Sequence, residues 1–238
     1  MVRTGGLLLS DKRRDGRTIV FSYPPRDLIR KPASGAGIEQ PLTQPGAALR
    51  SPVDWSRDGR FILYRQAGRD TQGDLWYLPV TPEGELAGDP KLYLGTRYDE
   101  FWARFSPEPS PHWVAYESDE FGRIEVYVQA FPEPRGARRI STAGGQYPQW
   151  NGNGRELFYV SPDNKLMAVD LKITTDSVEP SAPHELFPVA AVPRLQFPYD
   201  AAPDGQRFLV RVPVPQGTQP LHVIVNWPAL LTKGSAAQ

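Results

Sequence analysis

The sequence predicts an all-β protein, and three observations support this prediction. The 238 residues include 26 prolines and 21 glycines, spaced so closely that they leave little room for a helix of ordinary length. Aromatic residues, which favour strands, are plentiful, with 6 Trp, 10 Tyr and 10 Phe. A pattern of a tight turn followed by a strand also recurs at intervals typical of β-propeller blades.

The recurring pattern joins an Asp-Gly or Asn-Gly turn to a strand of aliphatic and aromatic residues. Clear copies lie at residues 15–21, 58–64, 153–159 and 204–210. A further copy, with a disturbed turn, ends at Tyr116. From Phe21 through Tyr64, Tyr116 and Tyr159 to Val210, the copies are 43, 52, 43 and 51 residues apart. This period matches a blade of four antiparallel strands.

The strand in each copy is apolar on both faces, as residues 61–64 show. A strand covered on one side would alternate apolar with polar residues, so each sheet is expected to lie between two others. A second strand follows each copy, at residues 27–29, 74–78, 124–128, 165–169 and 222–225. We expect one propeller domain over residues 1–238, with repeats at about 7–42, 50–95, 100–142, 146–188 and 196–231.

The turn at 54–60, Asp-Trp-Ser-Arg-Asp-Gly-Arg, and the strand start at 74–76, Asp-Leu-Trp, resemble the repeats of TolB-like β-propellers. Segments 31–35, 125–128 and 225–227 are similar to a narrower group, the propeller region at the C-terminus of many bacterial eukaryotic-like serine/threonine kinases. The resemblance implies six blades, whereas five repeats are visible. We therefore expect an incomplete ring, or a ring that residues 2–9 help to complete. The sequence lacks the kinase phosphate loop and the His-Arg-Asp and Asp-Phe-Gly motifs, so no kinase activity is expected.

Composition excludes several kinds of partner. Lys plus Arg and Asp plus Glu number 27 each, which argues against binding to nucleic acid or to an anionic membrane surface. Cysteine is absent, and none of the 3 histidines lies at metal-ligand spacing from another, so we expect no metal and no cofactor. The apolar run at 7–9 is too short for a signal peptide or a membrane span. We expect a cytoplasmic protein, or a periplasmic one if the chain is the C-terminal part of a membrane-anchored protein.

Loops that precede the inner strands of a propeller open toward the mouth of its central channel. An aromatic and polar ring at that mouth suits a protein, peptide or sugar ligand. The candidate ligand-binding residues are Tyr98, Asp99, Glu100, Gln146, Tyr147 and Gln196. Trp102, in contrast, is expected to pack between blades.

The function predicted from these features is a non-catalytic binding or scaffold module, a sensor or protein-interaction domain derived from a larger signalling protein. A first alternative is a glycosidase-like propeller, whose carboxylates must face each other across about 5–10 Å. The candidate acids for that reaction are Asp99, Glu100, Asp119, Glu120 and Asp200. A second alternative is an incomplete propeller whose open blade edges pair with a partner chain or with a second copy.

Overall fold

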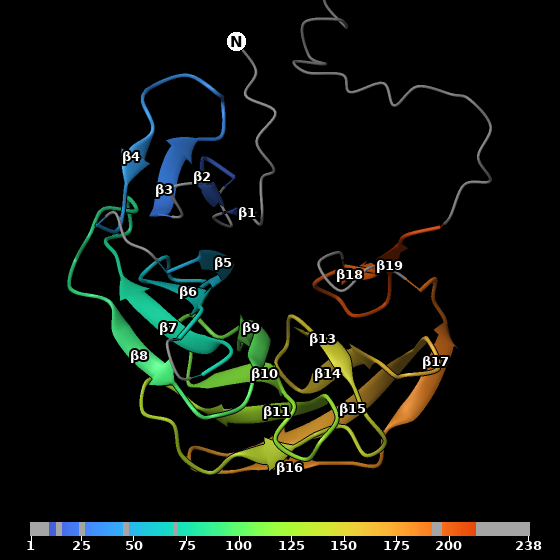
Figure 1. Cartoon of the computed structure of the whole chain (residues 1–238). Coiled ribbons are helices and arrows are strands. Elements are labelled where there is room, and N and C mark those ends of the chain that lie inside the picture. The colour runs from blue at the N-terminus through green and yellow to red at the C-terminus, as the bar shows by residue number, and fades with distance from the viewer. Residues whose placement is uncertain are drawn as a thin grey trace, which may run out of the picture.

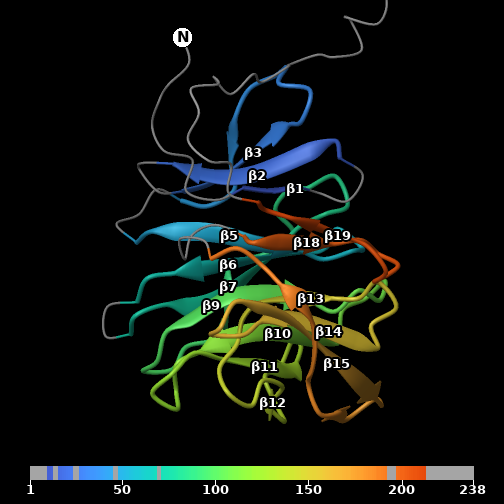
Figure 2. The ribbon, with the colours of Figure 1, turned by 90° about the vertical axis from the view of Figure 1, so that its right-hand side faces the viewer.

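The computed structural model describes residues 10–12, 16–23, 27–44, 48–68, 71–191 and 197–212. These residues form 19 strands and no helix. The described part of the chain therefore contains no helix that is long and apolar enough to cross a membrane. The strands make five antiparallel sheets that follow one another around a common centre (Figure 1). In Figure 2, turned by 90°, most of the strands run across the view. The predicted all-β fold of antiparallel propeller blades is therefore confirmed.

The sheets follow the chain in order, and we number them 1 to 5. Sheet 1 contains β1 (Ser10–Lys12), β2 (Thr18–Tyr23), β3 (Asp27–Pro32) and β4 (Gln40–Pro41). Sheet 2 contains β5 (Arg50–Trp55), β6 (Phe61–Gln66), β7 (Asp74–Pro79) and β8 (Lys91–Leu94). Sheet 3 contains β9 (Glu100–Phe105), β10 (Trp113–Ser118), β11 (Glu125–Ala130) and β12 (Arg138–Arg139).

Sheet 4 has five strands: β13 (Gln146–Trp150), β14 (Glu156–Val160), β15 (Lys165–Ile173), β16 (Val178–Pro180) and β17 (His184–Pro188). In the described part of the chain, sheet 5 consists of β18 (Tyr199–Ala201) and β19 (Phe208–Val210). Sheets 1 and 5 form the two ends of the arc in Figure 1. The strand expected at 222–225 and the closing segment at 2–9 lie outside the described residues, so closure of the ring stays a prediction.

Glycine at positive φ forms the turn between the first two strands of a sheet, as the Asp-Gly and Asn-Gly signals predict. Gly59 has φ 76° and Gly154 has φ 72°. Sheet 3 lacks this glycine and closes its turn with an acidic side chain. Ser106 Oγ donates to Glu108 Oε1 at 2.7 Å, and the same carboxylate oxygen accepts from the backbone N–H of His112 at 3.1 Å. The disturbed copy of the repeat is therefore a true copy with a different turn.

The core lies between the sheets, as the two-faced apolar strands predict. Consecutive residues of β6 pack in opposite directions. Ile62 and Tyr64 belong to a cluster with sheet 1, where they join Val20, while Leu63 joins Val114 in a cluster with sheet 3. Sheet 2 is thus covered on both faces by its neighbours, which explains why β6 is apolar on both faces.

Candidate ligand-binding site

The candidate residues that the structure describes lie where inner strands begin, and they differ in their exposure to solvent. Glu100, the first residue of β9, is 1% exposed, and Tyr147 in β13 is 4% exposed, so both are packing residues here. Tyr98, Asp99 and Gln146 are half-buried. Gln196 lies outside the described residues. The face that carries these candidates is therefore less accessible than expected.

Glu100 lies in an unusual electrostatic environment at the boundary of sheets 2 and 3. Its Oε1 accepts a hydrogen bond from Thr96 Oγ1 at 2.5 Å, while its Oε2 is buried with no hydrogen-bond partner among the described residues. Burial raises the pKa of Glu100 to about 7; the Thr96 hydrogen bonds oppose this shift, and the nearby Asp74 and Asp99 carboxylates add to it. The Oδ1 of Asp74 is likewise buried without a hydrogen-bond partner in the described part of the chain.

Asp99 is held in an ion pair that also joins sheets 2 and 3. Its Oδ1 lies 2.6 Å from Nη2 of Arg65 on β6. The same guanidinium donates through Nε to the backbone carbonyl of Glu100 at 3.2 Å. Asp119 accepts the backbone N–H of Asp99 at 3.0 Å. In the described ranges, no three His, Cys, Asp or Glu side chains gather closely enough to hold a metal ion.

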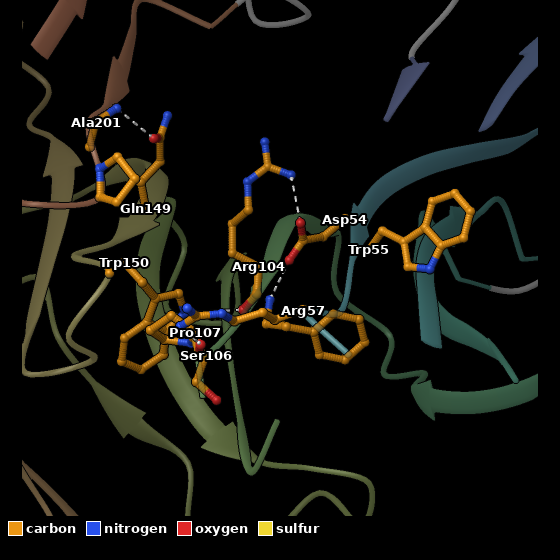
Figure 3. A pocket seen from close by; sticks show the side chains of 12 residues that line it. Asp54, Trp55, Arg57, Arg104, Ser106, Pro107, Gln149, Trp150 and Ala201 are labelled. Carbon is orange, nitrogen blue, oxygen red and sulfur yellow. Dashed lines mark hydrogen bonds and ion pairs between the residues drawn. The ribbon is translucent and has the colours of Figure 1, made fainter. Parts of the chain in front are cut away.

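A pocket of about 280 Å³ lies at the opposite face, where inner strands end and their turns begin (Figure 3). Residues from sheets 2, 3, 4 and 5 line it together, and we call it the strand-end pocket. The side chains that give it its chemistry are Asp54, Arg57, Arg104, Phe105, Gln149 and Trp150. The sequence prediction placed no candidate here, because it considered aromatic and polar residues before the inner strands and not those at the strand ends.

Three of the lining residues occupy one position of the repeat, two residues before the Ser or Asn that opens the turn. These are Asp54, Arg104 and Gln149. Asp54 and Gln149 also stand five residues before the turn glycines Gly59 and Gly154. Alignment of the repeats on these glycines is the sequence signal that could have identified the pocket.

The polar side chains at this repeat position bind the backbone of a neighbouring inner strand. Asp54 Oδ2 accepts the N–H of Phe105 at 2.6 Å. Gln149 accepts the N–H of Ala201 at 3.0 Å and donates to the carbonyl of Tyr199 at 2.9 Å. Each of these contacts links one sheet to the next, so the pocket wall and the sheet order depend on the same side chains.

Arg104 points back toward sheet 2 and is fixed by three kinds of contact. Its Nη1 donates to the carbonyl of Val53 and lies 3.8 Å from Oδ1 of Asp54. Its guanidinium carbon lies 4.9 Å from the ring centre of Phe197, a cation–π contact. Phe197 in turn packs against Trp102, with ring centres 4.3 Å apart. Trp102 is 2% exposed, as its expected packing role requires.

Bulges in the inner strands bring these side chains to the pocket. Register shifts interrupt β5 between Pro52 and Asp54 and β13 between Gln146 and Gln149. Trp102 and Tyr147, at the bulges of β9 and β13, have φ 35° and φ 59°. Such left-handed conformations cost about 1–3 kcal/mol for a non-glycine residue and concentrate at functional sites. A bulge also redirects the side chains that follow it.

Comparison with known proteins identifies the fold. No protein-family model and no curated protein matches the sequence. A protein described as a TolB by assignment, from Agrobacterium tumefaciens, has a similar structure. The TM-score is 0.57, with 16% identity over 75% of this chain and 65% of that chain. TolB from Acinetobacter baumannii gives a TM-score of 0.61 and 15% identity over 86% of this chain and 48% of that chain.

An oligogalacturonate lyase in complex with manganese is also similar, with a TM-score of 0.55 and 12% identity over 74% of this chain and 52% of that chain. The match therefore spans less than two thirds of each of these three structures. Identities of this size show a shared fold, and the lyase shows that the same architecture also occurs in an enzyme. This chain has the TolB-like β-propeller fold.

Proposed function

We propose that this chain is a non-catalytic β-propeller module that binds a protein or peptide at one propeller face, as a sensor or interaction domain of a bacterial signalling protein. The strand-end pocket carries the proposal, because four consecutive sheets build it together and line it with charged and aromatic side chains. Concave sites with an aromatic wall and a few convergent polar groups are the usual places of ligand binding. The resemblance of segments 31–35, 125–128 and 225–227 to kinase-associated propellers supports the signalling context.

The surroundings of two candidate carboxylates favour binding over glycoside hydrolysis. Glu100 has the raised pKa that a general acid needs, but it is 1% exposed and so has no access to a sugar in this conformation. Asp99 is ion-paired with Arg65 at 2.6 Å. In this pair, one oxygen of the Asp99 carboxylate is already engaged by a residue of the protein.

A peptide array tests the proposal. Wild-type protein is compared with Arg57→Glu, which reverses a charge in the pocket, and with Arg138→Glu, a matched change on the exposed outer strand β12. We expect the wild type and Arg138→Glu to bind a common subset of peptides that Arg57→Glu no longer binds. An array on which all three proteins give the same pattern, or none binds, would contradict the proposal.

The enzymatic alternative is tested in parallel with a panel of glycosides and acidic polysaccharides. Product formation is followed by reducing-sugar and unsaturated-uronate assays. Turnover that Asp99→Asn or Glu100→Gln abolishes would show that the propeller is catalytic.

A second candidate role, pairing with a partner chain or a second copy, is favoured by sheet 5. In the described part of the chain this sheet has two strands, and Leu209 on β19 is 76% exposed. An exposed edge with apolar side chains is a template for strand pairing. Sedimentation velocity across a range of concentrations distinguishes a monomer from a self-associating chain.

A further inference from the structure

We infer that the strand-end pocket recognises a side-chain carboxylate of an acidic peptide segment, with Arg57 and Arg104 as its binding residues. This inference rests on the proposed binding function and specifies its ligand. It follows from the charge of the pocket, from the hydrogen-bonding state of its polar groups and from its size.

The pocket has an excess of positive charge. Its ionisable lining residues are Arg57, Arg104 and Asp54, two guanidiniums and one carboxylate. Arg57 donates from Nη1 to the carbonyl of Pro107 at 2.9 Å, and Arg104 donates from Nη1 to the carbonyl of Val53. A guanidinium has five N–H donors. Most of these donors therefore have no partner among the described residues and remain available to an anion.

The two guanidiniums are positioned by different sheets and line the same pocket. Arg57 belongs to the turn after β5, and Arg104 lies on β9. In Figure 3 the Arg104 side chain extends toward Asp54, while Arg57 extends toward Pro107 and Trp150. Arginine binds carboxylates in a planar, two-pronged geometry that a Lys ammonium does not provide. The contacts of Arg104 with Asp54 and Phe197 hold its guanidinium in place before a ligand arrives, which reduces the entropy lost on binding.

The remaining polar groups of the wall are already satisfied. Both ends of the Gln149 amide bond the backbone of sheet 5. The indole N–H of Trp150 donates to the carbonyl of Arg104 at 3.2 Å. Ser106 Oγ donates to Glu108 and accepts the N–H of Trp113 at 3.0 Å. The pocket therefore offers a ligand two cations and aromatic carbon, with few neutral hydrogen-bonding groups.

This combination selects a peptide over a sugar. A sugar would give up water at many hydroxyl groups without replacement partners, and unmade hydrogen bonds of this kind cost affinity. A Glu or Asp side chain presents one carboxylate, and a neighbouring apolar residue can cover Phe105 and Trp150. The volume of about 280 Å³ is at the lower limit of ligand pockets, about 300 Å³. It accommodates one or two side chains of a longer segment.

The test uses pairs of array peptides that differ only in Glu against Gln, followed by fluorescence anisotropy with the best pair. We expect the wild type to bind the Glu peptide about tenfold more tightly than the Gln peptide, the difference expected for a charge-assisted hydrogen bond. Arg57→Gln should remove most of this preference. Asp54→Asn should strengthen binding of the Glu peptide, because it removes the competing charge and keeps an oxygen for the Phe105 N–H.

Arg138→Gln on the exposed strand β12 is the matched control and should retain the full preference. The preference should also weaken as salt concentration rises. Equal binding of the Glu and Gln peptides, or a preference that survives in Arg57→Gln, overturns the carboxylate assignment while leaving the binding module intact. Absence of binding to every peptide overturns both. Melting curves of each variant establish that altered binding does not reflect unfolding.

Discussion

Glu100 makes the stability of this propeller depend on pH in a direction opposite to that of an ordinary surface carboxylate. Its pKa rises from 4.5 to about 7 in the folded protein because the side chain is buried. The folded state therefore holds the proton more tightly than the unfolded chain does. The stabilisation that this proton gives is complete below pH 4.5, and it is lost as pH rises through about 7.

The magnitude follows from the two pKa values. A difference between 4.5 and about 7 corresponds to about 3 kcal/mol. This is a large part of the 5–15 kcal/mol by which domains are usually stable. Above neutral pH the protein must hold an ionised Glu100 beside Asp74, with a buried oxygen on each that has no hydrogen-bond partner among the described residues.

Glu100→Gln removes the titration while keeping the shape of the side chain and an oxygen for Thr96. Urea unfolding, followed by tryptophan fluorescence between about pH 5 and pH 8, gives the free energy of unfolding of both proteins. The wild type should lose about 2.5 kcal/mol of unfolding free energy relative to the variant across this range. Glu179→Gln, a change on β16 where the side chain is 62% exposed, controls for loss of a negative charge.

A constant difference between wild type and Glu100→Gln at every pH would refute the reasoning. It would show that Glu100 titrates alike in the folded and unfolded chains. The same result would require that water reaches the Glu100 side chain in the folded protein, because burial is the main cause of its raised pKa.

Three further substitutions test the contacts between sheets, each by urea unfolding. Gly73→Ala should lower the free energy of unfolding by about 1–2 kcal/mol, because the new Cβ would lie 2.2 Å from Nε of Arg65. In an Arg65→Ala background the same change should have almost no effect. Gln149→Leu should lower the free energy of unfolding by about 1–3 kcal/mol, because the N–H of Ala201 and a carbonyl of β18 lose their hydrogen-bond partner. An unchanged stability would show that water replaces the Gln149 side chain. Phe131→Ala should lower the free energy of unfolding by about 3–5 kcal/mol, since its ring contacts four other aromatic rings between sheets 2 and 3. A loss below about 1 kcal/mol would show that the cluster collapses around the gap.

The sequence contains the architecture of the propeller in local patterns. The turn glycines such as Gly59 require positive φ, and the strands that follow them are apolar on both faces, so both the hairpin and its place between sheets can be predicted. The arrangement of side chains around the strand-end pocket is harder to predict, although the repeat alignment points to its position. It depends on bulges where Trp102 and Tyr147 adopt left-handed φ, which the sequence gives no reason to expect of aromatic residues. A bulge shifts the in-and-out alternation, so counting along β9 or β13 assigns the wrong faces.

Burial of Glu100 was equally hidden from the sequence. Acidic residues are rarely fully buried, and Glu100 was predicted to bind a ligand because it lies where a loop meets an inner strand at the channel mouth. The side chain is buried because the loop before β7 lies against the start of β9, where the N–H of Glu100 donates to the carbonyl of Gly73 at 3.0 Å. This contact joins parts of the chain that no local pattern connects.

The cross-sheet bonds of Asp54 and Gln149 limit how a propeller of this kind can evolve. Each side chain is complementary to the backbone groups of the following blade. The Asp54 carboxylate accepts one N–H, and the Gln149 amide accepts an N–H and donates to a carbonyl. Blades are therefore not interchangeable units, even though their strands and turns are alike. Duplicating or transplanting one blade would bring together a side chain and a backbone that were never selected as a pair, so such rearrangements succeed only when both neighbours change with it.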